Sequence, residues 1–386
     1  MTQNRKFVWI VAAAVAVKLF LFVFAELRAP GAKFQIDSAR YIKSGMNLAE
    51  HGRFASSVSP EGAVYEYYRL PGYPLFLGVL HKIFRLPFSV IVLIQVLLTL
   101  LAAYCVYRTA LLVDPRMGFL SGLLILYDPP ITVFSLLILT EALYLLLMAL
   151  FAWGFVKYLR DRGTAAFFGA VVCLLLSIFV RPVGVYLILP VTGFVLAEGF
   201  LKKRFVKTVC LALAAFLILS APVELWKGRN KKVYGRRVIS SIDNATVNKY
   251  GLYRSYSRSD DPRVRETVPP VYYASIVLYS LSDLLIDPAS LKYFGKGALR
   301  SAWRVFGYPW GAAWVIGFLT GLAVMPKNRY YWFFVMVSGY FILGTVWAVT
   351  TMVTPRFRVP VMPFAAVLTA YGWRWFWEEY KRRKVS

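Results

Sequence analysis

The feature that most constrains this sequence is a series of long apolar runs that recur from one end of the chain to the other. A helix needs about 20 mostly apolar residues to cross the hydrocarbon core of a bilayer, and backbone groups in lipid must pair within the segment. Hydrophobic residues make up 59% of the 386 residues and charged residues 17%, which is too little charge to cover a soluble fold. We therefore predict an all-α polytopic membrane protein.

We treat residues 1–386 as a single transmembrane domain with about ten transmembrane helices. They are predicted at residues 7–27, 88–107, 117–127, 131–159, 164–180, 183–198, 206–226, 303–325, 331–353 and 359–377. Two long connections remain, residues 28–87 and 227–302, and in both we expect amphipathic juxtamembrane helices. Residues 71–84 are apolar but too short to span, so we predict an interfacial or re-entrant helix there.

The short connections predict the orientation, because cytoplasmic loops are enriched in Lys and Arg. Basic connections (108–116, 157–162, 198–204, 327–329 and the tail 381–384) alternate with connections poorer in charge (128–130, 181–182 and 354–358). This alternation favours two cytoplasmic termini and an inner (plasma) membrane protein with both long connections outside the cytoplasm. The first run lacks a clear cleavage site and is interpreted as an uncleaved helix.

The formal net charge is +26, and the cytoplasmic loops account for only part of it. The second long connection is also basic, with Lys227, Arg229, Lys231, Lys232, Arg236, Arg237, Lys249, Arg254, Arg258, Arg263 and Arg265. This excess indicates an anionic partner at the outer surface. Attraction to the headgroups of anionic membrane lipids is an equally good explanation. Nucleic acid is not expected on that side of a membrane.

Two acidic residues are candidates for chemistry. Asp37 begins a stretch in which Ala39, Ile42, Met46 and Ala49 share one face at helical spacing. Capping that helix is the commoner role of such an Asp, and a functional acid is the alternative. Glu141 lies among Leu and Ile in the fourth predicted span, where an ionisable residue suggests function. A protonated or paired structural Glu is the alternative there.

Four arginines lie where predicted spans meet the outer surface: Arg69, Arg181, Arg356 and Arg358. Guanidinium groups bind phosphate through paired hydrogen bonds, which suits a lipid-phosphate headgroup at this depth. Arg181 has a simpler explanation, because an interfacial arginine often extends its head toward water. The other three run against the positive-inside trend or precede the motif Pro-Gly-Tyr-Pro.

The remaining residue types predict no cofactor and no metal site. Cys105, Cys173 and Cys210 all lie inside apolar runs, which is typical of packing. His51 and His81 are the only histidines and lack the spacing of metal ligands. No phosphate-binding loop of the Walker type, Gly-x-Ser-x-Gly or Cys-x-x-Cys motif is present in the sequence.

Taken in order, five short motifs resemble those of the glycosyltransferase C superfamily. The similarity is to its polyprenyl-phosphate-sugar-dependent members, the relatives of protein O-mannosyltransferases and of the lipid A aminoarabinose transferase. The motifs are Asp37-Ser-Ala-Arg-Tyr41, Arg69-Leu-Pro-Gly-Tyr-Pro74, Leu139-Thr-Glu141, Arg181-Pro182 and Arg356-Phe-Arg358-Val-Pro360-Val-Met-Pro363. Larger members continue beyond the last of these spans, so acceptor recognition does not follow from the resemblance.

The resemblance implies a role for each matched residue. Asp37 would be the catalytic base and Glu141 a second catalytic acid. Arg69, Arg181, Arg356 and Arg358 would bind the donor phosphate, and Tyr41 and Tyr73 would line the donor or acceptor groove. The implied enzyme moves a sugar from a polyprenyl-monophosphate donor to a hydroxyl or amine of a glycan, lipid or protein, with inversion, in the biosynthesis of cell-envelope glycans.

Two other functions stay open at this level. A secondary transporter or lipid flippase would use Glu141 as a proton site, although no internal repeat of the kind common in transporters is visible. A polyprenyl-diphosphate-linked glycan ligase is a weaker possibility, since it also needs basic residues outside but does not require Asp37.

Overall fold

The computed structural model describes residues 3–201, 205–241, 270–289, 297–349 and 352–385, and most of them are helical. The all-α polytopic fold predicted from the apolar runs is confirmed. Within the described ranges, seven helices are long and apolar enough to cross a membrane, or eight if one bent pair counts as a single span. The helices at the predicted spans are α1 (Gln3–Arg28), α4 (Phe88–Val113), α5 (Gly118–Leu126), α6 (Pro129–Ser135), α7 (Glu141–Asp161), α8 (Thr164–Val180), α9 (Ile188–Leu201), α10 (Phe205–Tyr234), α15 (Ala298–Val324), α16 (Arg329–Val349) and α17 (Met362–Val385).

Every one of the ten predicted spans coincides with a helix, but the count of ten is not established by length and composition. Helix α8 is apolar but only 17 residues long, slightly shorter than a straight span needs. Helix α17 is long enough, but its second half is charged. These two helices account for the difference between the predicted ten and the eight that pass on apolar length.

The fourth predicted span, residues 131–159, is wrong as a single helix. Helix α6 ends at Ser135 and α7 begins at Glu141, while α5 and α6 meet at an angle of 51°. Asp128 caps α6 by accepting a hydrogen bond from the Ile131 backbone N–H at 3.0 Å, and two prolines open that helix. Proline lacks a backbone N–H and suits the first helical turn, so the chain starts a new helix here.

The break between α6 and α7 is stabilised by the segment that follows α1. The backbone N–H of Ile138 donates to the carbonyl of Lys33 at 2.8 Å, and the Ser38 hydroxyl donates to the carbonyl of Ile138 at 2.7 Å. Backbone groups released from helical pairing are thus paired with the protein, as burial at this depth requires. As a result Glu141 opens α7 and does not lie well inside a span.

The first long connection folds into a small layer at one end of the helices. It contains α2 (Ile36–His51), an antiparallel hairpin of β1 (Ala55–Ser59) and β2 (Gly62–Tyr65), α3 (Gly72–Leu77) and the π-helical turn η1 (Gly78–Ile83). The predicted amphipathic helix is present as α2, and the segment predicted not to span forms the short helix α3–η1. The hairpin was not predicted.

The buried face of α2 differs from the predicted one. Its buried residues are Ser38, Tyr41, Ser44 and Gly45, whereas Ala39 is exposed. The reason is close packing on α3, because a Cβ at Gly45 would lie 2.4 Å from the carbonyl oxygen of Pro74. Small residues that let two backbones touch decide this interface, and hydrophobic periodicity does not report them.

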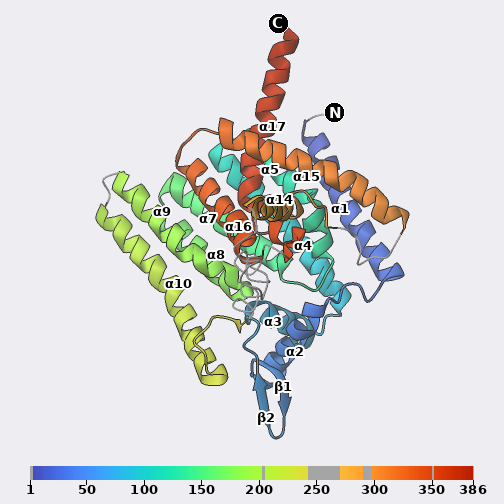
Figure 1. Cartoon of the computed structure of the whole chain (residues 1–386), viewed down its shortest axis with the longest axis vertical. Helices are drawn as coiled ribbons and strands as arrows, with labels where there is room; N and C mark the ends of the chain where they lie inside the picture. The colour runs from blue at the N-terminus through green and yellow to red at the C-terminus, as the bar shows by residue number, and fades with distance from the viewer. Residues whose placement is uncertain (1–2, 202–204, 242–269, 290–296, 350–351, 386) are drawn as a thin grey trace.

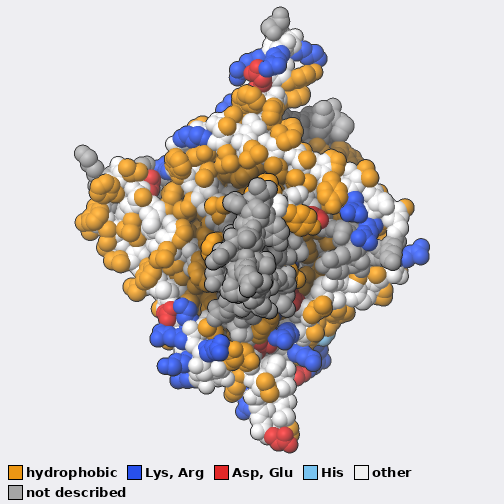
Figure 2. Space-filling view, in the orientation of Figure 1, with side chains coloured by type: hydrophobic (Ala, Val, Ile, Leu, Met, Phe, Trp, Pro, Cys, Tyr) orange, Lys and Arg blue, Asp and Glu red, His pale blue; other side chains and the backbone are white. Residues whose placement is uncertain are grey.

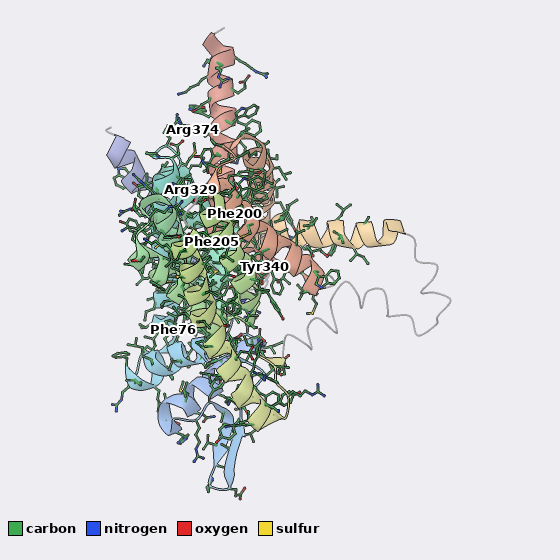
Figure 3. The ribbon with its side chains drawn as sticks, turned by 90° about the vertical axis from the view of Figure 1, so that its left-hand side faces the viewer. Phe76, Phe200, Phe205, Arg329, Tyr340 and Arg374 are labelled. Carbon is green, nitrogen blue, oxygen red and sulfur yellow. The ribbon has the colours of Figure 1, made fainter. Side chains whose placement is uncertain are left out.

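The two ends of the helices have different connections. Figure 1 shows both ends of the chain at one end of the molecule and α2 with the hairpin at the other. In Figure 3, Arg329 and Arg374 lie in the half from which the C-terminal helix emerges, and Phe76 of α3 lies in the opposite half. Connections predicted inside meet in the first half, where Glu198 pairs with Arg162 and Arg329. Which half faces the cytoplasm remains a prediction.

The surface agrees with a membrane-spanning body. In Figure 2 apolar side chains predominate on the described surface to either side of the centre, between the two ends of the molecule. Lys and Arg gather on the C-terminal helix at one end and around the last turns of α10 at the other. Of the second long connection, the structure describes the end of α10, the turn to residue 241, α14 (Pro270–Leu285) and residues 286–289 and 297–302. The predicted basic residues between 242 and 269 lie outside the described residues.

Candidate functional site

Five of the six charged residues singled out from the sequence meet at the end of the molecule that carries α2. Asp37 lies in the first turn of α2, and Arg69 precedes α3. Glu141 opens α7, and Arg181 follows the last residue of α8. Arg356 lies in the 3₁₀ turn η5 (Pro355–Arg358) just before α17. Segments more than 300 residues apart therefore contribute to one group, which we call the open cluster.

Arg356 is the centre of the open cluster because it contacts both acids. Its Nη1 donates to Oδ2 of Asp37 at 2.9 Å, and its Nε donates to Oε1 of Glu141. Nη2 of Arg69 donates to the other carboxylate oxygen of Asp37 at 2.5 Å. Nη1 of Arg181 donates to the same oxygen of Glu141 at 2.9 Å. Each carboxylate thus lies between two guanidinium groups.

The local sequence leaves Asp37 free for these contacts. The N-cap of α2 is Gln35, which forms a reciprocal capping box with Ser38. Asp37 therefore does not cap the helix, contrary to the simpler interpretation of its position. A carboxylate in the first turn is still favoured by the positive end of the helix dipole. Glu141 occupies the corresponding first turn of α7.

Exposure changes across the open cluster. The side chain of Asp37 is 27% exposed and that of Arg356 is 22% exposed, whereas that of Glu141 is 1% exposed. Among the described residues, Oε2 of Glu141 has no hydrogen-bond partner. A ligand arriving from outside would meet Asp37 and Arg356 first, with Glu141 beneath them.

Electrostatics favour the charged forms at the exposed side of the cluster. Burial opposes ionisation of Asp37, but the guanidinium groups of Arg356 and Arg69 outweigh it and hold the pKa of Asp37 below its ordinary value. Burial likewise opposes the charge on Arg356, and the negative charges of Glu141 and Asp37 outweigh it, so its pKa is raised. Asp37 is consequently an ion-paired carboxylate, and its basicity depends on what its arginines contact.

The predicted groove residues Tyr41 and Tyr73 lie beneath Arg69. Arg69 donates to the Tyr41 hydroxyl at 3.3 Å, and its guanidinium lies 5.1 Å from the centre of that ring. Tyr73 packs edge-on against Tyr41 and donates to Gln95 at 2.6 Å. Tyr41 is 4% exposed and Tyr73 is wholly buried, so both support Arg69 from the interior in this state and neither lines an open groove.

Arg358 lies away from the open cluster. Its Nη2 donates to Oδ2 of Asp128 at 2.9 Å, and both side chains are fully buried. Buried Lys18 lies nearby and donates to Thr132 at 2.8 Å. We call Lys18, Asp128 and Arg358 the closed cluster. In a 3₁₀ turn, with three residues per turn, side chains two positions apart point to different sides, so Arg356 and Arg358 diverge.

Sequence reasoning missed two residues beside the open cluster. The ring of Tyr68 lies between two guanidinium groups, 4.5 Å from that of Arg40 and 5.1 Å from that of Arg69. Arg40 is exposed one turn after Asp37 on α2 and, within the described ranges, has no carboxylate partner. The i to i+3 spacing of Asp37 and Arg40 on an amphipathic helix was the available signal.

The open cluster is filled by its own ion pairs, and two hollows among the described residues lie elsewhere. One of about 740 Å³ lies beside the last turns of α10. Another of about 400 Å³ is lined by Met46, His81, Lys82 and Arg85. In the part of the chain that the structure describes, no group of three or more His, Cys, Asp or Glu side chains is placed to hold a metal ion.

A protein-family model matches part of the sequence. The family described as dolichyl-phosphate-mannose-protein mannosyltransferase matches residues 69–226, a range that contains Arg69, Glu141 and Arg181. None of the curated proteins matches the chain significantly.

Solved structures share the fold. ArnT from Cupriavidus metallidurans has a TM-score of 0.59 in the apo state and 0.58 bound to undecaprenyl phosphate, at 16% identity. The similarity covers 96% of this chain and 60% of ArnT. The oligosaccharyltransferase AglB from Archaeoglobus fulgidus, in complex with an inhibitory peptide and a dolichol-phosphate, has a TM-score of 0.53 at 13% identity. That similarity covers 100% of this chain and 52% of AglB.

The chain therefore spans between half and two thirds of the length of the structures it resembles. At these identities the structural similarity concerns the fold, which extends over nearly the whole of this chain. The family match adds sequence similarity from the residues just before α3 into α10. The partial family match and the shared fold both support the similarity to the glycosyltransferase C superfamily that the motifs indicate.

Proposed function

We propose that the protein is a membrane glycosyltransferase that moves a sugar from a polyprenyl-monophosphate donor to a hydroxyl or amine of an acceptor at the extracytoplasmic face. The observation that carries the proposal is the open cluster, in which three arginines and two acids from five distant segments meet at a partly exposed site. The partial family match and the fold shared with ArnT support this chemistry.

The charge of the open cluster suits a phosphate. Three guanidinium groups face two carboxylates, so one positive charge is left uncompensated. Arg40 adds a second at the exposed edge. Guanidinium groups bind phosphate oxygens through charge-assisted pairs of hydrogen bonds. That ArnT was solved with undecaprenyl phosphate and AglB with a dolichol-phosphate supports a lipid-linked phosphate as the ligand here.

Donor binding would also free the base. In this structure both oxygens of Asp37 accept hydrogen bonds, one from Arg69 and one from Arg356. A bound phosphate competes for these two guanidinium groups, which leaves a carboxylate oxygen of Asp37 for the acceptor. Losing these partners also raises the pKa of Asp37 toward its ordinary value, which makes it a better base when donor is present.

The reaction then needs only groups already in the site. The acceptor oxygen or nitrogen attacks the anomeric carbon while Asp37 takes its proton. The bond from that carbon to the phosphate oxygen breaks, and the electron pair leaves with the polyprenyl phosphate. Arg69, Arg181 and Arg356 stabilise the charge that develops on the leaving phosphate. Attack opposite to the leaving group inverts the anomeric configuration.

Glu141 has a different role in this proposal. It is almost fully buried and contacts Arg356 and Arg181, so it holds two guanidinium groups in place and does not itself meet the acceptor. We assign it as a positioning residue.

The test is transfer by purified, reconstituted protein given a panel of radiolabelled polyprenyl-phosphate sugars and a membrane extract as the source of acceptors. Asp37→Asn should abolish labelled product while the protein still binds polyprenyl phosphate. Glu50→Gln, which changes an exposed acid at the far end of α2, is the matched control and should keep full activity. Full activity in Asp37→Asn would contradict the proposal.

Two further arms separate the alternative functions. Uptake of an intact substrate into vesicles, with no chemical change, would indicate a transporter or flippase. Transfer from polyprenyl-diphosphate glycans but not from monophosphate sugars would indicate a ligase.

A further inference from the structure

Helix α10 is longer than a membrane span. Its 30 residues, Phe205–Tyr234, extend over about 45 Å at 1.5 Å per residue, whereas the hydrocarbon core measures about 30 Å. Figure 3 shows it running from Phe205 in one half of the molecule to its last turns in the other, near the β hairpin. The last two to three turns, which we call the foot of α10, therefore extend into the headgroup layer or beyond.

The hollow of about 740 Å³ lies on one face of this foot. Ala221, Leu225, Gly228 and Lys232 line it and follow one another at the spacing of a single helix face. Ala221 and Leu225 are exposed, and Leu225 is 76% exposed. The face thus begins apolar on the side of the span and becomes basic at the end of the helix.

Gly228 keeps the middle of this face open. A Cβ at this position would have no neighbouring atom within 4 Å, so close packing does not explain the glycine. Glycine in a helix interior also costs stability relative to alanine. Its effect here is to leave a gap between the apolar and the basic parts of the hollow.

Two segments of the chain supply cations to the basic end of the hollow. Lys232 comes from the helix, and Arg237 comes from the chain that folds back after Gly235. Lys232 is exposed and has no carboxylate partner among residues 3–201, 205–241, 270–289, 297–349 and 352–385. Arg237 pairs with exposed Glu224 at 2.7 Å, a contact that solvent weakens.

Arg229 also lines the hollow but is held by the first long connection, since it donates to the backbone carbonyls of Phe54, at 3.0 Å, and Glu66. Glu224, the one acid in the lining, is paired with Lys227 as well as with Arg237. The lining keeps a positive balance, because three cations face this single carboxylate.

We propose that the foot of α10 is a binding site for an anionic phospholipid, with the lipid phosphate on Lys232 and Arg237 and an acyl chain along Ala221 and Leu225. The order of apolar and basic residues matches the order of chain and headgroup in a lipid, at the depth where that junction lies. A soluble anion would make no use of the apolar wall. The site is independent of the proposed glycosyltransferase activity.

The position of the site gives it a structural consequence. The foot and the turn after it hold the segment that leads to Arg69: the Ser240 hydroxyl donates to the Tyr68 carbonyl at 2.8 Å, and Tyr234 stacks on Tyr67 with ring centres 3.8 Å apart. A lipid bound at the foot braces this segment.

The experiment is native mass spectrometry of the full-length protein purified in detergent and titrated with phosphatidylglycerol or, in parallel, phosphatidylcholine. We expect selective retention of phosphatidylglycerol. Lys232→Gln with Arg237→Gln should weaken it roughly tenfold or more, since basic residues near an anionic headgroup contribute individually. Gly228→Leu should weaken it comparably by filling the gap, with no change of charge.

The matched control removes the same charge from the same foot outside the hollow. Lys231→Gln with Arg236→Gln changes two exposed cations that do not line it, and this variant should retain phosphatidylglycerol like the native protein. Equal losses in both double variants, with no loss in Gly228→Leu, would overturn the site in favour of general charge attraction. Retention of phosphatidylcholine equal to that of phosphatidylglycerol would also overturn the site. Inorganic phosphate retained as well as phosphatidylglycerol would do the same.

Discussion

The open and the closed cluster both combine acidic and basic side chains and share one turn of chain, yet they differ in their exposure to solvent. The turn η5 supplies Arg356 to the open cluster and Arg358 to the closed one. Asp37 beside Arg356 is 27% exposed, whereas Asp128 and Arg358 have no exposed side-chain surface. The first arrangement can exchange its partners for a ligand, and the second cannot do so without exposing buried charge.

The closed cluster has a different task, which its contacts describe. Arg358 donates to Asp128 at the start of α6 and to the carbonyl of Leu285 at the end of α14, and its guanidinium lies 5.7 Å from the ring of Trp314 in α15. It therefore fixes η5 against three elements and, through η5, the position of Arg356. Variants of the two clusters can test this division between a ligand-exchanging and an anchoring cluster.

The largest effect is expected from breaking the buried pair. Asp128→Asn leaves the guanidinium of Arg358 without its counter-charge, and breaking a buried pair on one side destabilises a protein by about 3–5 kcal/mol. We expect a lower melting temperature in detergent. Asp128→Leu with Arg358→Leu should recover part of that stability, because it removes both charges of the pair while Lys18 keeps its hydrogen bond to Thr132. If the double variant is no more stable than Asp128→Asn, buried charge is not what the pair provides.

Removing the central arginine of the open cluster should act on activity. Arg356→Ala takes one cationic donor away from the leaving phosphate, and loss of one such donor costs about 10²- to 10³-fold in turnover. Arg356→Lys should recover only part of this, because an ammonium cannot contact two carboxylates with the geometry of a guanidinium. In Arg356→Ala the turnover should fall, while the melting temperature should fall much less than in Asp128→Asn. A stability loss as large as that of Asp128→Asn would contradict the distinction between the clusters.

The third prediction concerns pH. Because the pKa of Asp37 is depressed from its ordinary value of 3.8, its ion pairs add stability above that value and lose it as the pH falls through the depressed pKa. Wild type should therefore exceed Asp37→Asn in melting temperature by a constant amount at neutral pH, and the difference should shrink only below about pH 4. A difference that already disappears near neutral pH would show that Asp37 is not held as a carboxylate by Arg69 and Arg356.

The smallest effect is expected at the exposed edge of the open cluster. Arg40→Gln removes a cation that has no carboxylate partner among the described residues, so stability should change by no more than about 0.5 kcal/mol. The affinity for a polyprenyl phosphate should fall several-fold, with a weaker dependence on salt. Unchanged affinity and salt dependence would place the ligand away from this edge. Lys43→Gln, an exposed change two turns from Asp37 on the same helix, is the control.

Sequence by itself determined the class of fold, most of the helices and the identity of the charged candidates. Apolar length is a local property, and a segment in lipid has to satisfy its backbone within itself, so the helices are readable one at a time. The charge of the short connections likewise predicted which loops lie together at each end of the helices. Ionisable side chains near apolar segments cost free energy in a membrane, so they are rare and suggest function. This allowed the selection of Asp37, Arg69, Glu141, Arg181 and Arg356.

Which charges pair follows from the packing of distant segments and could not be predicted from the sequence. Arg356 and Arg358 are indistinguishable as residues of one motif, and their separation depends on the 3₁₀ geometry of η5 and on what packs to each side of it. The break before Glu141 depends on hydrogen bonds of the Ile138 backbone, which donates to the carbonyl of Lys33 and accepts from Ser38, both at least 100 residues away in sequence. Ion pairs and close backbone contacts form between segments that are distant in the sequence. The periodicity of a single segment therefore cannot predict them.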